Sequence, residues 1–230
     1  MMEKKQREFV IPGQLLATGN YRVGDGAYRE GNEIYSAVVG LAEIGERWVR
    51  VIPLEGPYIP RVGDKVIGVV VDLYQYGWAV DINSPYQGNL FASSLLGRRL
   101  DPSQEDISKY LTVGDIIAAE IADVDERFHV LLKTEGIGLG KLKGGKLLEI
   151  SPAKIPRVLG KKGSMLEILQ KIGGCRLFVG QNGRIMVWGR NERMVEAVAE
   201  ALFTIEREAH TSGLTDRIRL MLEKKKSEVS

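Results

Sequence analysis

A glycine-rich stretch, GIGLGKLKGG at residues 136–145, separates two parts of the sequence that have different residue patterns. Before it, short apolar runs alternate with turn signals, which is typical of β-strands. Beyond it, apolar residues recur at helical spacing. Because five glycines in ten residues make any regular element costly in conformational entropy, we predict a linker over residues 137–146. The predicted fold class is multidomain, with β structure before the linker and α/β structure after it.

The part before the linker is predicted to hold two β domains. Up to Arg61, the runs EIYSAVVG and RWVRVIP lie among the turn signals PG, GDG and EGP, which favours a small N-terminal β domain over residues 1–61. Residues 62–136 then contain five strand-like runs: KVIGVVVDL, GWAVDI, GNLFAS, DIIAAEIADV and HVLLK. The third connection is longer and more polar than the others, with room for a short helix. Five strands with such a connection predict an OB barrel.

The part after the linker, residues 147–230, is predicted to fold as α/β. KLLEIS has the pattern of a strand, and it is followed by a short helix over Lys154–Leu159 and a second helix over Met165–Ile172. The runs CRLFVGQ and RIMVWG flank Asn182-Gly183, a strong hairpin signal. Asn191 is expected to cap a long helix, and the basic amphipathic segment LTDRIRLMLEKKK follows it.

The turn between the two short helices is the most informative local feature. Its residues are Gly160, Lys161, Lys162 and Gly163. We expect Ser164 and Glu167 to start the second helix as a capping box. Glycines without Cβ atoms let a sugar-phosphate chain approach the backbone, and the first amides of a helix attract phosphate. The order strand, helix, GKKG turn, helix, hairpin, helix predicts a KH domain, which clamps about four nucleotides of single-stranded nucleic acid.

Charge is distributed unevenly, although the net charge of the chain is only +2. Residues 1–140 carry 14 Lys and Arg against 20 Asp and Glu, whereas residues 141–230 carry 18 against 10. A basic C-terminal part suggests a polyanionic partner. Beside the GKKG turn we expect Lys154 and Arg157 to contact phosphates as well. A surface of solvated lysines would give the same counts, so the charge supports the KH interpretation only together with the turn.

A second candidate surface lies in the predicted barrel. Tyr74, Tyr76 and Trp78 are spaced by two and would share one face of a strand, where they would form a platform for base stacking. Neighbouring strands are expected to border this platform with Phe91, Arg127 and His129. The alternative is that some of these rings fill the core of the barrel.

The barrel sequence resembles an S1 domain. YGWAVDI, GNLFAS and VGDIIAAEIADVDERFHVLL follow the S1 pattern of a glycine-bearing strand, a second strand and a closing hairpin that carries VD. Ala79 departs from this pattern because the family usually has an aromatic residue there, and Phe91 stands where the family often has a polar ring. The resemblance therefore implies weaker base stacking than in a typical member.

The order of a small β domain, an S1 domain and a KH domain resembles the S1–KH RNA-binding cap subunit of the archaeal RNA exosome. The resemblance covers nearly the whole chain and includes IPGQLLATG, VGDGAY, IYSAVVG and PYIPRVGDKVIGVV. It implies a non-catalytic subunit of a trimeric cap, which binds single-stranded RNA and guides 3′ ends to a ring of phosphorolytic RNase subunits. It also implies ring contacts through the N-terminal domain and a preference for poly(A). A stand-alone S1/KH regulator of translation or transcription is the alternative, although it has no obvious need for the N-terminal β domain.

No sequence motif indicates intrinsic catalysis. GKLKGGKL lacks the Ser or Thr with which a phosphate-binding loop holds Mg²⁺. The tight acidic cluster of Asp123, Asp125 and Glu126 falls at an expected turn, and His129 and His210 have no visible nucleophile partner. The sequence has one cysteine and no run near the ~20 apolar residues of a membrane span, and MMEKKQREFV does not have the apolar stretch expected of a signal peptide. We expect a cytoplasmic protein with no catalytic residues, metal site, cofactor or membrane contact.

Overall fold

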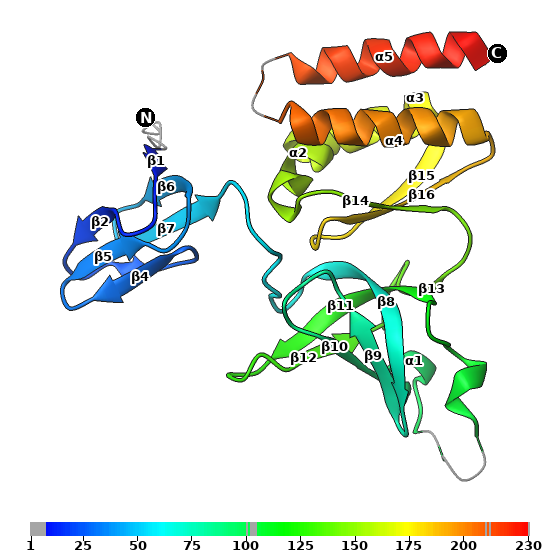
Figure 1. Ribbon diagram of the computed structural model, residues 1–230, viewed down its shortest axis with the longest axis horizontal. Helices are drawn as coiled ribbons and strands as arrows, with labels where there is room; N and C mark the ends of the chain where they lie inside the picture. The colour runs from blue at the N-terminus through cyan, green and yellow to red at the C-terminus, as the bar shows by residue number, and fades with distance from the viewer. Residues whose placement is uncertain (1–7, 100, 102–104, 210, 212, 230) are drawn as a thin grey trace. The chain divides into compact units, whose positions relative to one another are not determined.

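The computed structural model describes residues 8–99, 101, 105–209, 211 and 213–229 (Figure 1). The chain divides into two compact units, Met1–Gly56 and Pro57–Ser230. Among the described residues, no helix is both long enough and apolar enough to cross a membrane. His210 lies outside the described residues.

The first unit consists of two small sheets built from short strands. These strands are β1 (Glu8–Val10), β2 (Leu15–Thr18), β3 (Arg22–Val23), β4 (Ala27–Glu30), β5 (Glu33–Ser36), β6 (Gly40–Ile44) and β7 (Trp48–Pro53). One sheet has the order β1-β6-β7-β3 and the other β2-β5-β4. Val10, Ala42 and Val51 form a small buried core. The nearly buried Glu43 carboxylate is paired with Arg50 at 2.5 Å, which offsets the cost of burying its charge.

The second unit begins with a closed five-stranded barrel. Its strands are β8 (Lys65–Tyr74), β9 (Gly77–Asp81), β10 (Gly88–Phe91), β11 (Ile116–Val124) and β12 (Val130–Lys133). They have the order β12-β10-β9-β8-β11, and an additional pairing of β12 with β11 closes the barrel. Every predicted strand run of the barrel is therefore confirmed. The interior is apolar, with Val66, Val80 and Ile117 among its buried residues.

The long third connection of the barrel contains helix α1 (Ala92–Leu96) and a 3-10 turn at Ile107–Lys109, which confirms the expected short helix. The glycine-rich segment is not wholly a linker. Gly140–Leu142 forms strand β13, which pairs with the open edge of β11. These interstrand hydrogen bonds offset the entropic cost of ordering glycine, so the expectation of an irregular linker was wrong at this place.

The remainder of the second unit is a three-stranded sheet covered by helices. Its strands are β14 (Lys146–Glu149), β15 (Cys175–Val179) and β16 (Arg184–Gly189), in the order β14-β16-β15. Its helices are α2 (Ile155–Leu159), α3 (Ser164–Gly173), α4 (Glu192–Arg207) and α5 (Leu214–Val229). The Asn191 side chain accepts a hydrogen bond from Arg193 N at 3.0 Å, so the predicted cap of the long helix is confirmed. From β14 to α4, the chain order is strand, helix, helix, two hairpin strands and helix, as predicted.

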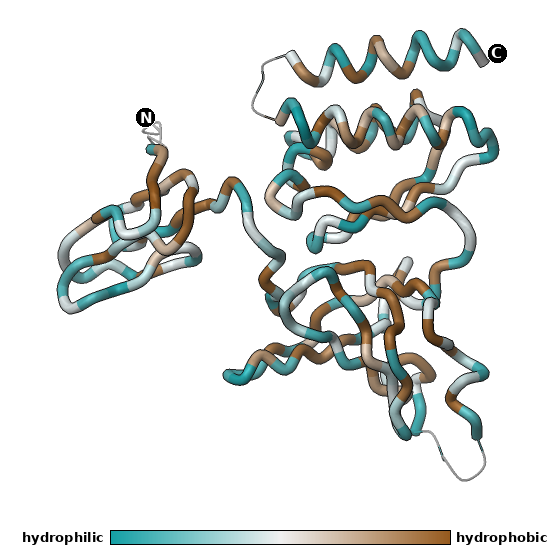
Figure 2. Tube along the Cα trace, in the orientation of Figure 1, coloured by the Kyte–Doolittle hydropathy of each residue, from teal (hydrophilic) through white to brown (hydrophobic). Residues whose placement is uncertain are grey.

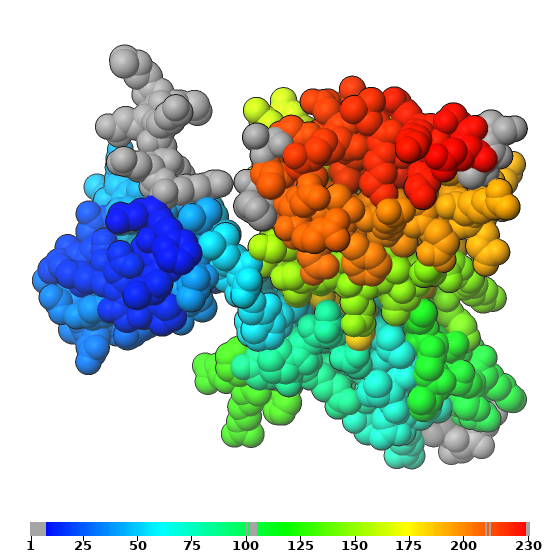
Figure 3. Space-filling view, turned by 45° about the horizontal axis from the view of Figure 1, so that its top comes forward, coloured from blue at the N-terminus to red at the C-terminus, as the bar shows by residue number. Residues whose placement is uncertain are grey.

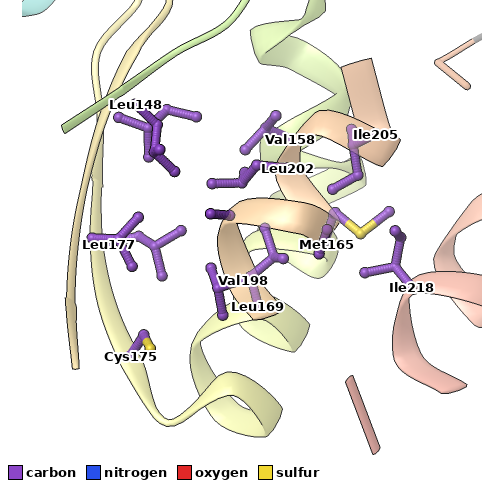
Figure 4. Packing of buried hydrophobic residues seen from close by; sticks show 14 of the residues in the cluster. Leu148, Val158, Met165, Leu169, Cys175, Leu177, Val198, Leu202, Ile205 and Ile218 are labelled. Carbon is purple, nitrogen blue, oxygen red and sulfur yellow. The ribbon is translucent and has the colours of Figure 1, made fainter. Parts of the chain in front are cut away.

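Helix α5 adds a layer to this arrangement, because it packs against both α3 and α4. Figures 1 and 3 show it lying along α4. Hydrophobic and hydrophilic residues alternate along both α4 and α5 (Figure 2). Leu214, Ile218 and Leu222 of α5 are buried in the same core as the sheet. Met165, which follows the GKKG turn, points towards Ile218 of α5 (Figure 4). The start of α3 is therefore held from the side facing away from the sheet. The architecture confirms the expected class of a small N-terminal β domain, an S1-type OB barrel and a C-terminal KH domain.

Candidate nucleic-acid interface

The GKKG turn is exposed and has the backbone conformation that its glycines make possible. Gly160 has φ +73° and ψ 176°, and Gly163 has φ +83°. At both of these positive φ values, a residue with a side chain would be strained. A Cβ atom on Gly160 would lie 2.6 Å from Met165 N, whereas a Cβ on Gly163 would have no other atom within 4 Å. Gly160 is therefore needed for close packing against α3, and Gly163 leaves open space outside the turn. Lys162 also has a positive φ of 55°, which shows how sharply the chain reverses here.

The start of α3 differs from the sequence prediction. Gly163 occupies the N-cap position and supplies no capping side chain, because Ser164 is already the first helical residue. Glu167 forms an ion pair with Lys171 one turn further along. The predicted capping box was therefore wrong by one residue. No side chain therefore caps the start of α3, although its first amide, Ser164 N, already donates to Lys161 O within the turn.

Basic side chains surround this helix start. Lys161 and Lys162 are exposed in the turn, and Arg157 is exposed in the last turn of α2. Lys154 is half-buried at the end of the short 3-10 turn that precedes α2. All the residues expected from the sequence at this site thus belong to one continuous segment that leads into α3. The arrangement presents backbone amides and positive charge together, which suits a phosphate chain.

The barrel has an exposed aromatic cluster at the β8–β9 turn. Tyr74, Tyr76 and Phe91 are 48%, 53% and 51% exposed. Phe91 is brought to Tyr74 by strand pairing, because both residues pair with Gly77 across β9. The three rings line a hollow of about 200 Å³. Three half-exposed rings around a shallow hollow can stack on bases.

Trp78 is not one of the exposed rings, although it contributes to the lining of the hollow. It is fully buried in the barrel core, where its Nε1 donates to Leu111 O at 3.0 Å. The expected alternation fails because Tyr74 pairs with Gly77, so that the chain reverses at Gln75 and Tyr76 and the strand does not continue to Trp78. The prediction of one aromatic row from Tyr74 to Trp78 was therefore wrong. The alternative interpretation, core filling, holds for Trp78.

Arg127 and His129 lie in the turn between β11 and β12. The Asp125 carboxylate accepts hydrogen bonds from Arg127 N and His129 N, both at 2.8 Å, and lies 2.7 Å from His129 Nδ1. These hydrogen bonds, with that from His129 N the strongest cause, lower the pKa of Asp125 below its ordinary value. The carboxylate is thus used to shape the turn. Among the described residues, no group of three or more His, Cys, Asp or Glu is arranged to hold a metal ion.

The turn that carries Arg127 and His129 lies apart from the aromatic hollow on the barrel. Val130, next to His129, pairs with Gly88 at the start of β10, whereas Phe91 is the last residue of that strand. Three residues of strand correspond to about 10 Å. Arg127 and His129 therefore extend the surface along β10 and do not line the hollow.

Sequence reasoning missed two features of the second unit. Phe128, with φ +59°, stacks on Tyr86 at a ring-centroid distance of 4.3 Å and is 44% exposed between Arg127 and His129. Asn182, within a hairpin turn, and Arg184, directly after it, are both buried, although polar residues at such turns are ordinarily solvated. The Asn-Gly pair signals the turn but carries no information on what the asparagine side chain contacts.

Comparison with known proteins identifies the same three parts. Residues 7–55 match the family described as the exosome RNA binding protein RRP4 N-terminal domain, residues 57–123 match the RRP4 S1 domain, and residues 145–193 match a KH domain. A crystal structure assigned as an exosome complex RNA-binding protein is 41% identical to this chain, with a TM-score of 0.72. The match covers 76% of this chain and 100% of that one.

Curated relatives match over nearly the whole length. The exosome complex component Rrp4 of Thermococcus kodakarensis is 46% identical over 95% of this chain and 86% of the relative. Rrp4 of Sulfurisphaera tokodaii is 43% identical over 97% of this chain and 92% of the relative. With a shared domain order and identity of this extent, the chain belongs to the Rrp4 family of exosome complex components.

Proposed function

We propose that this protein is an RNA-binding, non-catalytic subunit of an exosome and that the GKKG turn clamps single-stranded RNA. The observation that supports this most directly is the exposed turn itself. It joins open space beside Gly163, two exposed lysines and an uncapped helix start in one short segment. A ribose-phosphate chain can approach such a backbone closely and be held by its amides.

The barrel supplies a second RNA-binding surface in this proposal. Tyr74, Tyr76 and Phe91 stack on bases, while Arg127 and His129 contact the backbone further along β10. Stacking of this kind tolerates any base, since every base has a flat face. The combination suits a protein that receives many different RNAs.

The first unit is the proposed docking surface for a ring of phosphorolytic RNase subunits. It exposes large apolar side chains that its own small core does not use: Phe9, Ile11, Leu15, Val39 and Ile44. Exposed apolar residues in this number are typical of protein–protein contacts. In the proposed assembly, copies of this chain form a trimeric cap in the cytoplasm. The cap feeds RNA 3′ ends, with a preference for poly(A), to the ring for 3′-to-5′ degradation.

A stand-alone S1/KH regulator of translation or transcription is the second candidate. The same RNA surfaces would serve it equally well, but the exposed apolar residues of the first unit favour the exosome. Native copurification distinguishes the two, because an exosome subunit brings ring subunits with it and a regulator does not. Neither candidate degrades RNA on its own, so we expect no RNA turnover by the purified chain in the presence of phosphate and Mg²⁺.

RNA binding itself is tested by a charge reversal in the turn. In the full chain carrying both Lys161→Asp and Lys162→Asp, we expect weaker binding to single-stranded RNA and a flatter dependence on salt. Loss of two phosphate contacts lowers the slope of log K against log salt by about 1.4. The control reverses two exposed lysines elsewhere, Lys109 and Lys224, and has the same net charge. Equal slopes for the two double variants would refute the proposed clamp.

A further inference from the structure

The hairpin turn of the KH domain, Gly180–Gly183, continues the pairing edge of the S1 barrel. The β8–β9 ladder begins at Val69 and Asp81, so the edge of β8 that faces β9 has no strand partner at Lys65 and Ile67. The turn supplies these partners. Gln181 N donates to Lys65 O at 2.8 Å, and Lys65 N donates to the Gln181 side chain at 2.7 Å.

Asn182 supplies the hydrogen-bond partners of Ile67, the next residue of β8 without a strand partner on this edge. Its Nδ2 donates to Ile67 O and to Ile82 O, each at 2.8 Å, and its Oδ1 accepts from Ile67 N at 3.2 Å. The side chain is fully buried. One amide therefore satisfies three backbone groups at the end of two barrel strands. Gly180 permits this approach, because a Cβ there would lie 2.4 Å from Asn182 Oδ1 and 3.0 Å from Ile67 N.

Arg184 adds a charged contact across the same junction. Its side chain is 6% exposed, and it reaches both Asp81 of the barrel and Glu149 of β14. Nη1 donates to Asp81 O at 2.6 Å, Nη2 lies 2.5 Å from Asp81 Oδ2, and Nε lies 2.7 Å from Glu149 Oε1. The planar guanidinium thus fixes both the distance and the angle between the two domains.

Apolar burial accompanies these polar contacts. Ile67 and Met186 are fully buried, yet neither belongs to the core of the barrel or to that of the KH domain. They lie on β8 and β16, and these two strands are in contact. The two domains therefore share a buried surface as well as a hydrogen-bonded edge. Such a junction resists the relative motion that a linker alone would allow.

From this junction we infer that the S1 and KH domains bind RNA as one rigid platform and that Asn182 is the residue that positions them. This inference rests on the proposed RNA-binding function. A strand of RNA held at the GKKG turn then meets the barrel surface in a fixed register. Without the junction, the second surface would be reached only through a mobile tether, with a lower effective concentration.

The test uses the full chain and its Asn182→Ala variant. NMR relaxation measures whether the amides of the two domains share one rotational correlation time, and titrations measure affinity for two RNAs. One RNA is long and unstructured, and the other has about four nucleotides, the length that a KH turn clamps. We expect common tumbling in the wild type and separate tumbling in the variant. We also expect about a tenfold loss of affinity for the long RNA only. Asn32→Ala, at an exposed turn of the first unit, is the matched control and should change nothing.

A milder pair of variants covers the case in which Asn182→Ala does not fold. Arg184→Lys keeps the charge but loses the planar fork, and Arg176→Lys on the neighbouring strand is its control. The inference is overturned by separate tumbling in the wild type. It is equally overturned by a folded junction variant that keeps common tumbling and full affinity for the long RNA. If the wild type tumbles as one body but binds neither RNA, the proposed function fails although the rigid junction stands.

Discussion

Replacing Gly160 by alanine gives a prediction whose size follows from the local geometry. With φ +73° and ψ 176°, Gly160 occupies a region of backbone space that is almost restricted to glycine. Placing a side chain there costs about 1–3 kcal/mol. The new Cβ would also lie 2.6 Å from Met165 N and 2.8 Å from Met165 Cβ, so α3 would have to move. Such overpacking adds about 1–3 kcal/mol.

Gly163→Ala is the matched comparison within the same turn. Gly163 has φ +83° and ψ 6°, in the left-handed helical region, and a Cβ there would contact no other atom within 4 Å. Only the backbone cost of about 1–2 kcal/mol remains. We therefore predict that Gly160→Ala lowers the free energy of opening of α3 by about 2–6 kcal/mol and that Gly163→Ala lowers it by less.

Amide hydrogen exchange across α3 measures these opening free energies directly. RNA titrations should show a second contrast, because the methyl group of Gly163→Ala would enter the open space proposed for the RNA backbone. This variant should weaken RNA binding by more than its small effect on stability accounts for. If Gly163→Ala destabilised α3 as much as Gly160→Ala, close packing against Met165 would not be the reason for Gly160.

Three further predictions concern the barrel and its long third connection. Tyr76→Ala should weaken RNA binding by about 1–3 kcal/mol without affecting stability, since the ring is exposed. Trp78→Ala should instead lower the free energy of unfolding by about 3–5 kcal/mol, because it empties a fully buried site; denaturant melts with RNA titrations separate the two effects. Hydrogen bonds, first from Arg98 and then from Tyr110, lower the pKa of Glu105 from 4.5 to about 2. Because the folded-state pKa is the lower one, this cluster stabilises the fold above pH 4.5, and its contribution is lost as the pH falls towards 2. An NMR carboxyl titration with a midpoint near 4.5 in the wild type would contradict this, and Arg98→Met should raise the midpoint towards that value, because only the hydrogen bond from Tyr110 would remain.

The strands and helices were predictable because their signals are local. Short apolar runs marked each barrel strand, and Asn191 marked the start of α4 through its own side chain. The GKKG turn was predictable for the same reason, because its glycines and lysines are consecutive in the sequence and form the turn by themselves. The aromatic row failed at Trp78 because a two-residue turn interrupted the strand, and the sequence pattern alone does not show where a strand reverses.

The domain junction was beyond sequence reasoning for a different reason. Asn182 bonds to Ile67, and Arg184 bonds to Asp81, so each contact joins residues roughly one hundred positions apart. A residue pattern within a short window contains no information on such pairs. The asparagine of an Asn-Gly turn already has a sufficient local explanation, which concealed its longer-range contact.

The contact of the hairpin turn with β8 also limits how these two domains can be exchanged in evolution. A KH domain without an asparagine at this position would leave Ile67 and Ile82 with unsatisfied backbone groups. The bare edge of β8 would then be free to pair with a strand of another molecule, a known route to aggregation. Successful recombination would have to transfer the barrel and the hairpin together, so the inheritable module is the pair of domains.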